Sequence, residues 1–129
     1  QAVILDGYAH LSVQGPRDNY GKPLTGQVPT DLSVDEAILA ARNVGLYTLV
    51  ALQDAIGSLD RVEQVVRTFG MVNAAPGFTE HPRVIDGFSN LFIDVFGEKG
   101  RGARSAVGMS SLPFNIPVEV EITIKILAE

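Results

Sequence analysis

Residues 118–126 alternate strictly between apolar and polar side chains, and no other segment limits the possible folds as strongly. The two sets are Val118, Val120, Ile122, Ile124 and Ile126 on one side and Glu119, Glu121, Thr123 and Lys125 on the other. Successive side chains of a β-strand point to opposite faces of its sheet, so this period of two predicts a strand with one buried and one polar face. The chain must therefore contain a sheet that is covered on one side.

Two segments have the apolar spacing of α-helices. Ser33 and Glu36 form a capping box, in which each side chain accepts a hydrogen bond from an otherwise unpaired amide of the first turn. Apolar residues then recur at helical spacing until Gly57, which predicts a helix of about six turns. Its stretch 46–52 is apolar on more than one face, so we expect cover from two sides. A second helix is predicted over residues 82–96, with a proline in its first turn.

Shorter signals complete a β-β-α-β-α-β-β order. Asp6-Gly7 predicts a tight hairpin turn, because both residues tolerate positive φ angles. The glycine-rich segment 97–102 is predicted to be a flexible connection. The other strands are predicted at residues 2–5, 8–13, 61–75 and 104–111. We therefore predict one α+β domain over residues 1–129, with two helices on one face of a mixed sheet.

The composition excludes several classes of protein. With 46% hydrophobic and 19% charged residues, the chain has the composition of an ordered protein. It has no cysteine and no apolar stretch long enough to span a membrane. Disulfides, thiol nucleophiles and a membrane partner are therefore not expected, and we predict a cytoplasmic location. A net charge of −5 without a dense Lys/Arg cluster argues against nucleic acid as the main partner.

Few residues could support metal or phosphate chemistry. His10 and His81 are the two histidines, and they lie far apart in the sequence, so no metal site is predicted. The glycines of residues 97–102 are not followed by the Lys-Ser/Thr pair of a phosphate-binding loop. We accordingly expect no cofactor.

The clearest candidates for chemistry are one arginine and two carboxylates. Arg104 lies at the start of a predicted strand, and Glu119 and Glu121 lie on the polar face of the last one. An arginine can hold a carboxylate by two parallel hydrogen bonds, and a glutamate can position or deprotonate a water. These residues would suit a small anionic substrate. The alternative is that they form cross-strand ion pairs on a solvated sheet face.

The pairing of the last two strands decides whether Arg104 and Glu119 can meet. If residues 104–111 and 118–126 form a hairpin, Arg104 lies opposite Lys125. Arg104 and Glu119 then share a face but lie roughly 20 Å apart along the strands. A site that uses both would need a neighbouring subunit, and the polar face of the sheet would be the surface on which that subunit packs.

Several segments together resemble one known family. Residues 103–108 (Ala-Arg-Ser-Ala-Val-Gly), Leu112-Pro113 and residues 117–121 (Pro-Val-Glu-Val-Glu) are similar to the C-terminal signature of the Rid family, also called the YjgF/YER057c/UK114 family. Ser12-Val13-Gln14-Gly15-Pro16 is similar to the family's Ser-Gly-Gln-x-Pro strand end. The likeness covers nearly the whole chain. It indicates a divergent RidA-like branch, whose members are also named endoribonuclease L-PSP-like.

The resemblance implies a fold like that of the bacillus-type chorismate mutase, a homotrimer around a barrel of sheets with clefts between the subunits. It also implies the hydrolysis of reactive enamines and imines, such as 2-aminoacrylate released by pyridoxal-phosphate enzymes, to a 2-keto acid and ammonia. By the family pattern, Arg104 would grip the substrate carboxylate and Glu119 would position the attacking water. Ser12, Val13 and the backbone of Ala106 would line the pocket.

Three pocket positions depart from the usual family pattern. Ala106 stands where many deaminases have Cys, and Val13 replaces the Gly of the strand-end motif. Phe88 stands where deaminases often carry a helix Tyr, and we expect it to contact the substrate. The retained Arg104 and Glu119 favour activity, whereas the altered pocket leaves the identity of the substrate open.

Two other functions remain open beside the deaminase. A homotrimeric binding or regulatory protein could sense a small carboxylate through Arg104 without turnover, and it would not need Glu119. Some relatives were named for endoribonuclease activity, but the acidic balance of the chain and the lack of a His/Lys pair count against that activity here. An enamine and imine deaminase is the leading prediction.

Overall fold

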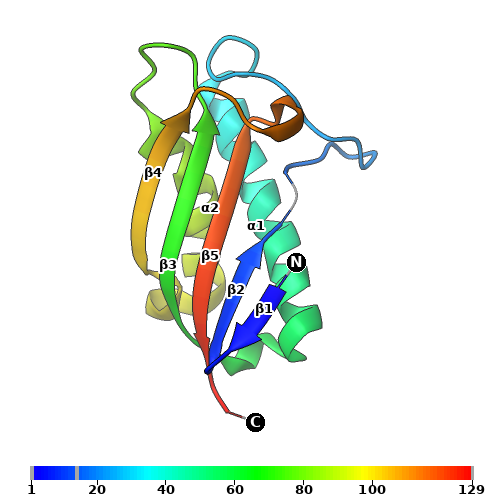
Figure 1. Ribbon diagram of the computed structural model, residues 1–129, viewed down its shortest axis with the longest axis vertical. Helices are drawn as coiled ribbons and strands as arrows, with labels where there is room; N and C mark the ends of the chain where they lie inside the picture. Colours follow the sequence, from blue (N-terminus) through cyan, green and yellow to red (C-terminus); the bar gives the residue numbers. More distant parts are fainter. Residues whose placement is uncertain (1, 14, 129) are drawn as a thin grey trace.

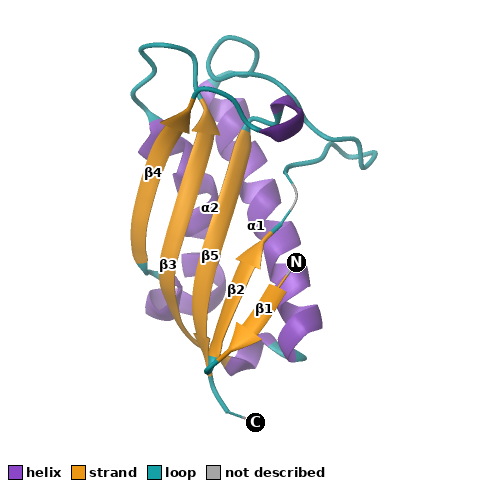
Figure 2. Ribbon diagram, viewed as in Figure 1, coloured by secondary structure: helices purple, strands orange, loops and turns teal. Residues whose placement is uncertain are grey.

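The computed structural model describes residues 2–13 and 15–128. Gln14, which belongs to the strand-end motif, lies outside the described residues. The described chain forms a five-stranded sheet in the order β1-β2-β5-β3-β4, with two long helices against one face (Figure 1, Figure 2). The predicted α+β class is thereby confirmed. The elements are β1 (Ala2–Leu5), β2 (Tyr8–Ser12), α1 (Val34–Ile56), β3 (Val62–Asn73), α2 (His81–Phe96), β4 (Ala103–Met109) and β5 (Val118–Ile126).

Strand β5 lies in the middle of the sheet, between β2 and β3 and antiparallel to both. Its five apolar side chains are buried in the core that the sheet forms with the helices. The intervening polar side chains, from Glu119 to Lys125, face the open side of the sheet. The period of two therefore predicted both the strand and its buried face correctly.

The hairpin at the N-terminal end is also confirmed. Asp6 and Gly7 have φ angles of 53° and 81°, and they connect Leu5 directly to its cross-strand partner Tyr8. Two successive positive φ angles are what a type I′ turn requires, and they match the right-handed twist of the flanking strands. The second strand ends at Ser12, one residue earlier than predicted.

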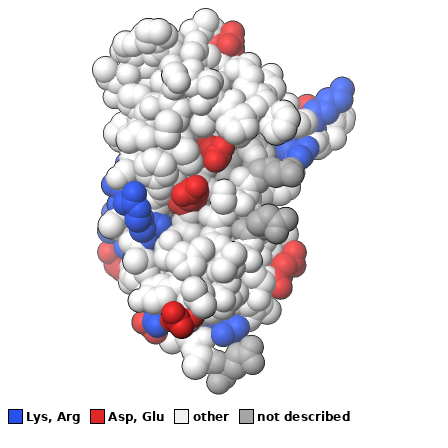
Figure 3. Space-filling model, viewed as in Figure 1, with Lys and Arg blue, Asp and Glu red and all other residues white. Residues whose placement is uncertain are grey.

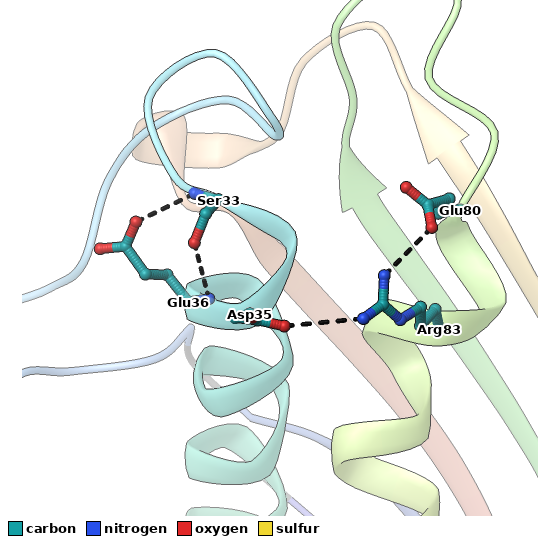
Figure 4. Close-up of polar contacts among 5 residues, drawn as sticks. All are labelled: Ser33, Asp35, Glu36, Glu80 and Arg83. Atoms are coloured by element: carbon teal, nitrogen blue, oxygen red, sulfur yellow. Dashed lines mark hydrogen bonds and ion pairs between the residues drawn. The ribbon is translucent and has the colours of Figure 1, made fainter.

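Helix α1 begins with the predicted capping box (Figure 4). The Ser33 amide donates to Glu36 Oε1 at 3.0 Å, and the Glu36 amide donates to Ser33 Oγ at 3.1 Å. Hydrogen bonding to the Ser33 backbone amide first, and to the Ser33 side chain second, lowers the pKa of the Glu36 carboxyl. Arg83 of α2 lies between Asp35 and Glu80, at 3.7 Å and 3.2 Å, and so connects the N-terminal turns of the two helices.

The outer side of α1 is not covered within this chain. Leu39, Leu46 and Val50 are 66%, 45% and 58% exposed, although the opposite side of the helix is buried. The expectation of cover from two sides over residues 46–52 is therefore wrong for one chain. An apolar stretch indicates that its side chains can be buried. It does not indicate whether the same chain supplies a second layer of secondary structure that covers them.

Glycines permit two close approaches around α2. A Cβ built on Gly87 would lie 2.1 Å from the backbone oxygen of Ile38 in α1. The two helices can therefore pack this closely only because residue 87 has no side chain. Gly100 is buried against the carbonyl of Phe92 in the same way. Residues Gly97–Gly100 form a compact 3-10 turn, and the predicted flexible connection at 97–102 is wrong over these residues.

The predicted hairpin between residues 104–111 and 118–126 does not form. In the described sheet, β4 pairs with β3 alone, in parallel, and β3 separates it from β5. The partner of Arg104 is therefore Thr68, and Lys125 pairs with Tyr8 and Gln64 instead. Helix α2 connects β3 to β4, and such a crossover returns the chain beside the strand that it left and parallel to it.

Candidate functional site

A cavity of about 460 Å³ lies where β2 ends and β5 begins. One side is formed by the end of β2 and the loop that follows it, and the other by the short turn Pro113–Asn115 and the start of β5. The lining residues are Ser12, Val13, Gly15, Arg17, Pro23, Pro113, Phe114, Ile116 and Glu119. Three residues predicted from the family pattern, Ser12, Val13 and Glu119, therefore share one cavity.

Glu119 is a carboxylic acid at the wall of this cavity. Its side chain is half-buried on the open face of the sheet. Burial, and to a lesser extent the like charge of Glu121 two residues along the strand, raise the pKa of the Glu119 carboxyl above its ordinary value of 4.5. A carboxyl with a raised pKa can both accept and return a proton closer to neutral pH, which is what acid–base chemistry at this position requires.

The raised pKa predicts how stability changes with pH. The folded protein binds the Glu119 proton more tightly than the unfolded chain does, so this group makes the folded state less stable as the pH rises from about 4.5 through the raised pKa. Glu119→Gln removes that loss. We expect the variant to gain urea resistance over the wild type at about pH 8 but not at about pH 4. Equal differences at both pH values would contradict the shift.

The wall opposite Ser12 is held by a buried amide. Asn73, at the end of β3, is 2% exposed and donates through Nδ2 to Asn115 Oδ1 at 3.0 Å and to the Ile116 carbonyl at 3.1 Å. Phe114 and Asn115 have φ angles of 56° and 57°, which are unusual for residues with side chains. The network around Asn73 keeps this strained turn, and with it Phe114, at the cavity.

Arg104 lies on the other face of the sheet. Its guanidinium donates to Asp86 Oδ1 at 2.8 Å and to Ser89 Oγ at 3.3 Å, and both partners belong to α2. Glu119 points to the open face, because its neighbours Val118 and Val120 are buried under the helices. The structure therefore does not bring Arg104 and Glu119 together within one chain.

Arg104 lines a second, smaller cavity of about 180 Å³ with Asp86, Ser89 and the glycine-rich segment before β4. The ion pair joins the edge strand β4 to α2, and the Arg104 side chain is 25% exposed. A carboxylate that is to bind Arg104 must compete with Asp86 or approach the part of the guanidinium that remains accessible.

Phe88 and Ala106 lie away from the cavity of Glu119. Phe88 is fully buried and stacks on Phe92 with 4.6 Å between the ring centroids, so it is part of the core and no ligand can contact it in this chain. Ala106 pairs with Gly70 on the helix side of β4 and packs against the same core. Phe88 was selected because it matches a pocket residue of the family on a helix. That match did not show that its side chain points into the core of this chain.

Arg17, Phe114 and Ile116 line the cavity, but sequence reasoning did not select them. Arg17 follows the strand-end motif within a loop rich in Gly and Pro. Neither periodicity nor a family pattern predicts where a side chain points in such a loop. A search for charged residues directly after the strand-end motif of residues 12–16 would have found Arg17. No local signal places the turn Pro113–Asn115 beside that loop, because their contact joins distant parts of the chain.

Metal and membrane features were also searched for. In the described part of the chain, no three His, Cys, Asp or Glu side chains come together as a group that could hold a metal ion. Among residues 2–13 and 15–128, no helix is both long enough and apolar enough to cross a bilayer.

Comparison with known families matches residues 8–125 to the model described as "YjgF/chorismate mutase-like, putative endoribonuclease". The chain belongs to this family. The match covers β2 to β5 and so includes every strand and turn that lines the cavity of Glu119. It also confirms the resemblance to the Rid family that the C-terminal signature indicated.

Proteins similar to this chain match most of its length. Protein TCP17 of Trypanosoma cruzi is 43% identical over 118 residues, which are 91% of this chain and 74% of that protein. A protein of unknown function from Agrobacterium tumefaciens is 38% identical over 98% of this chain and 82% of that chain, with a TM-score of 0.92. A structure from Shewanella oneidensis that carries the endoribonuclease name is 32% identical over 97% and 83% of the two chains, with a TM-score of 0.90.

Proposed function

We propose that the protein is an enamine and imine deaminase that converts 2-aminoacrylate-like intermediates to 2-keto acids and ammonia. The observation that supports this function best is the half-buried Glu119, whose pKa is raised and which lines a cavity together with Ser12 and Val13. Family membership adds the Arg and Glu signature that the deaminases carry. The cavity is large enough for a small-molecule substrate.

The reaction needs only one positioned water and one group that moves protons. The enamine first takes a proton on carbon to become an imine. Water then adds its oxygen to the imine carbon, and the Glu119 carboxylate accepts the proton that this water releases. Glu119 returns this proton to the nitrogen, which gives a carbinolamine. The same carboxylate then moves the proton of the carbinolamine hydroxyl to the nitrogen, the carbon–nitrogen bond breaks as the keto C=O forms, and ammonia leaves the 2-keto acid. The exposed hydroxyl of Ser12 lies at the same cavity and can hydrogen-bond the water or the nitrogen.

We further propose that the complete site forms between subunits of a homotrimer. Arg104 and Glu119 lie on opposite faces of the sheet, so Arg104 can serve only the Glu119 cavity of a neighbouring protomer. The open face of the sheet, which faces the viewer in Figure 3, is mostly uncharged. Buried Met71, Leu112 and Ile116 form an apolar cluster there with Phe69, Val107 and Met109, which is the kind of surface that a second subunit covers.

Keto-acid release from 2-aminoacrylate generated in situ tests the activity. We expect the wild type to accelerate release and Arg104→Ala to lose most of the acceleration, because a charge-assisted contact to the carboxylate contributes about 1.5–3 kcal/mol. Lys99→Ala, which removes an exposed cation before β4 without touching either cavity, is the control. Binding of a keto acid by a wild type that gives no acceleration would instead support the carboxylate-binding protein.

Mixed trimers distinguish a shared site from a site within one chain. Arg104→Ala and Glu119→Gln chains are each expected to be inactive alone. If the site is shared, refolding them together restores activity, because some cavities then combine an intact Glu119 with an intact Arg104 from the neighbour. No recovery, or a sedimentation mass near the 13.8 kDa of one chain, would remove the shared site.

Endoribonuclease activity is the alternative function. The name of the family and that of the Shewanella relative support it. The net charge of −5 opposes it, because phosphate contacts from Lys and Arg supply most of the affinity for RNA. We expect no binding of single-stranded RNA at low salt, measured by fluorescence anisotropy. Binding that falls steeply with salt would overturn this prediction and favour the endoribonuclease.

A further inference from the structure

We propose that the cavity of Arg104 recognises small 2-amino and 2-imino acids at two points, the carboxylate through Arg104 and the nitrogen through Asp86. The inference rests on the proposed deaminase function and deepens it. It adds a residue, outside the Arg and Glu signature, that distinguishes the nitrogen-bearing substrate from the keto-acid product.

One side of α2 holds the guanidinium of Arg104. Asp86 Oδ1 accepts from Nη1 at 2.8 Å, Ser89 Oγ accepts from the same nitrogen at 3.3 Å, and the Pro82 carbonyl accepts from Nη2 at 3.4 Å. The three residues follow one another at spacings of four and three, so they lie along one side of the helix. An arginine has five N–H donors, and within the described part of the chain Nε of Arg104 donates to no residue. Arg104 therefore keeps donors for a carboxylate while α2 fixes its orientation.

Asp86 keeps an acceptor beside this cation. Its Oδ1 binds Arg104, whereas Oδ2 accepts from no residue in the ranges 2–13 and 15–128. The Asp86 side chain is 48% exposed and lines the same cavity as Arg104. An ionised carboxylate can only accept hydrogen bonds. A ligand atom that meets Oδ2 must therefore carry a hydrogen to donate.

This requirement separates the substrate of the proposed reaction from its product. The enamine, the imine and the parent amino acid all carry N–H on the carbon next to the carboxylate, whereas the keto acid carries an oxygen without hydrogen there. Arg104 meets the same carboxylate in all of them, so it cannot distinguish them. Asp86 stabilises the N–H group and repels the keto oxygen, which favours binding of the substrate and release of the product.

The rest of the cavity limits the size of the ligand. Its volume of about 180 Å³ is well below the roughly 300–1,000 Å³ of pockets for drug-sized ligands. Thr68, Ser89 and Asn90 contribute polar side chains to the lining. The second cation of the lining, Arg101, is already paired with Glu98 at 3.3 Å. A short, polar skeleton such as that of alanine is therefore the expected ligand.

Calorimetric titration with L-alanine and pyruvate, which share one carbon skeleton, tests the preference without turnover. We expect the wild type to bind L-alanine at least tenfold more tightly than pyruvate. Asp86→Asn keeps the shape and the acceptor for Arg104, but its amide can donate to the keto oxygen, so the preference should fall below threefold. Arg104→Ala should lose both ligands.

Asp94→Asn is the matched control. Asp94 is an exposed carboxylate on the same helix that does not line the cavity, so this variant makes the same change in net charge and should keep the full preference. Equal affinities for the two ligands in the wild type, no binding of either, or a tenfold preference that persists in Asp86→Asn would overturn the inference.

Hydrolysis of 2-aminoacrylate by the wild type separates this inference from the proposed function. A preference that needs Asp86, without hydrolysis, would end the proposed function and retain the site. Hydrolysis without a preference that depends on Asp86 would retain the proposed function and end the inference.

Discussion

Glu119→Gln is expected to lower kcat for imine hydrolysis by roughly 10²–10⁴-fold while the protein stays folded and still binds the keto acid. The amide cannot take the proton that the attacking water releases, although it has nearly the same shape. Burial disfavours the ionised form of the half-buried Glu119. The substitution therefore removes a charge that is unfavourable at this position, and it adds no volume. The loss should therefore fall on kcat rather than on stability.

Glu121→Gln is the matched control for this experiment. Glu121 lies two residues along the same face of β5 but is exposed and does not line the cavity. We expect its kcat to stay near that of the wild type, with the acid limb of the pH–rate profile moved to lower pH, because removing the neighbouring charge lowers the pKa of Glu119. Equal kcat in Glu119→Gln and wild type would show that Glu119 does not move the proton.

Gly87→Ala is expected to destabilise the protein strongly, although it adds only one methyl group. The new Cβ would meet the backbone oxygen of Ile38 at 2.1 Å, and a backbone atom cannot move aside as a side chain can. Overpacking of this kind costs about 3 kcal/mol, and the higher helix propensity of alanine returns only about 1 kcal/mol of that. The net loss should lower the urea midpoint without changing the slope of the transition.

The control for Gly87→Ala is Asn90→Ala on the same helix. Asn90 is exposed, so the change alters helix propensity but creates no contact with α1. We expect Asn90→Ala to be neutral or slightly stabilising. If Gly87→Ala were equally neutral, α1 and α2 would have to be able to separate there, and the helix packing described above would be wrong at this point.

Most of the fold could be predicted because its signals are local. The capping box at Ser33, the Asp6-Gly7 turn and the alternation in β5 each depend on residues within a few positions of one another, and all three are present in the structure. The pairing of β4 was not predictable in this way. It depends on where α2 returns the chain, and adjacency in sequence wrongly favoured a hairpin with β5.

Only part of the candidate site could be predicted, because a motif is local whereas the pairing of the strands is not. The family pattern selected Ser12, Val13 and Glu119, which do share a cavity. It also selected Arg104, whose side chain turns to the opposite face, and Phe88, which is in the core. A motif fixes the kind of residue, but the face on which the side chain lies follows from strand register, and the register was known only from the structure.

The central place of β5 also determines when the sheet can form during synthesis. β5 follows the other four strands in the chain, yet β2 and β3 pair on its two sides. While the ribosome makes the preceding residues, the inner edges of both strands lack their partner, and such edges are prone to pair with other chains. The sheet, and the cavity that β2 and β5 build together, can be completed only after β5 has emerged. Until that moment, the inner edges of β2 and β3 in a nascent chain are open to pairing with other strands.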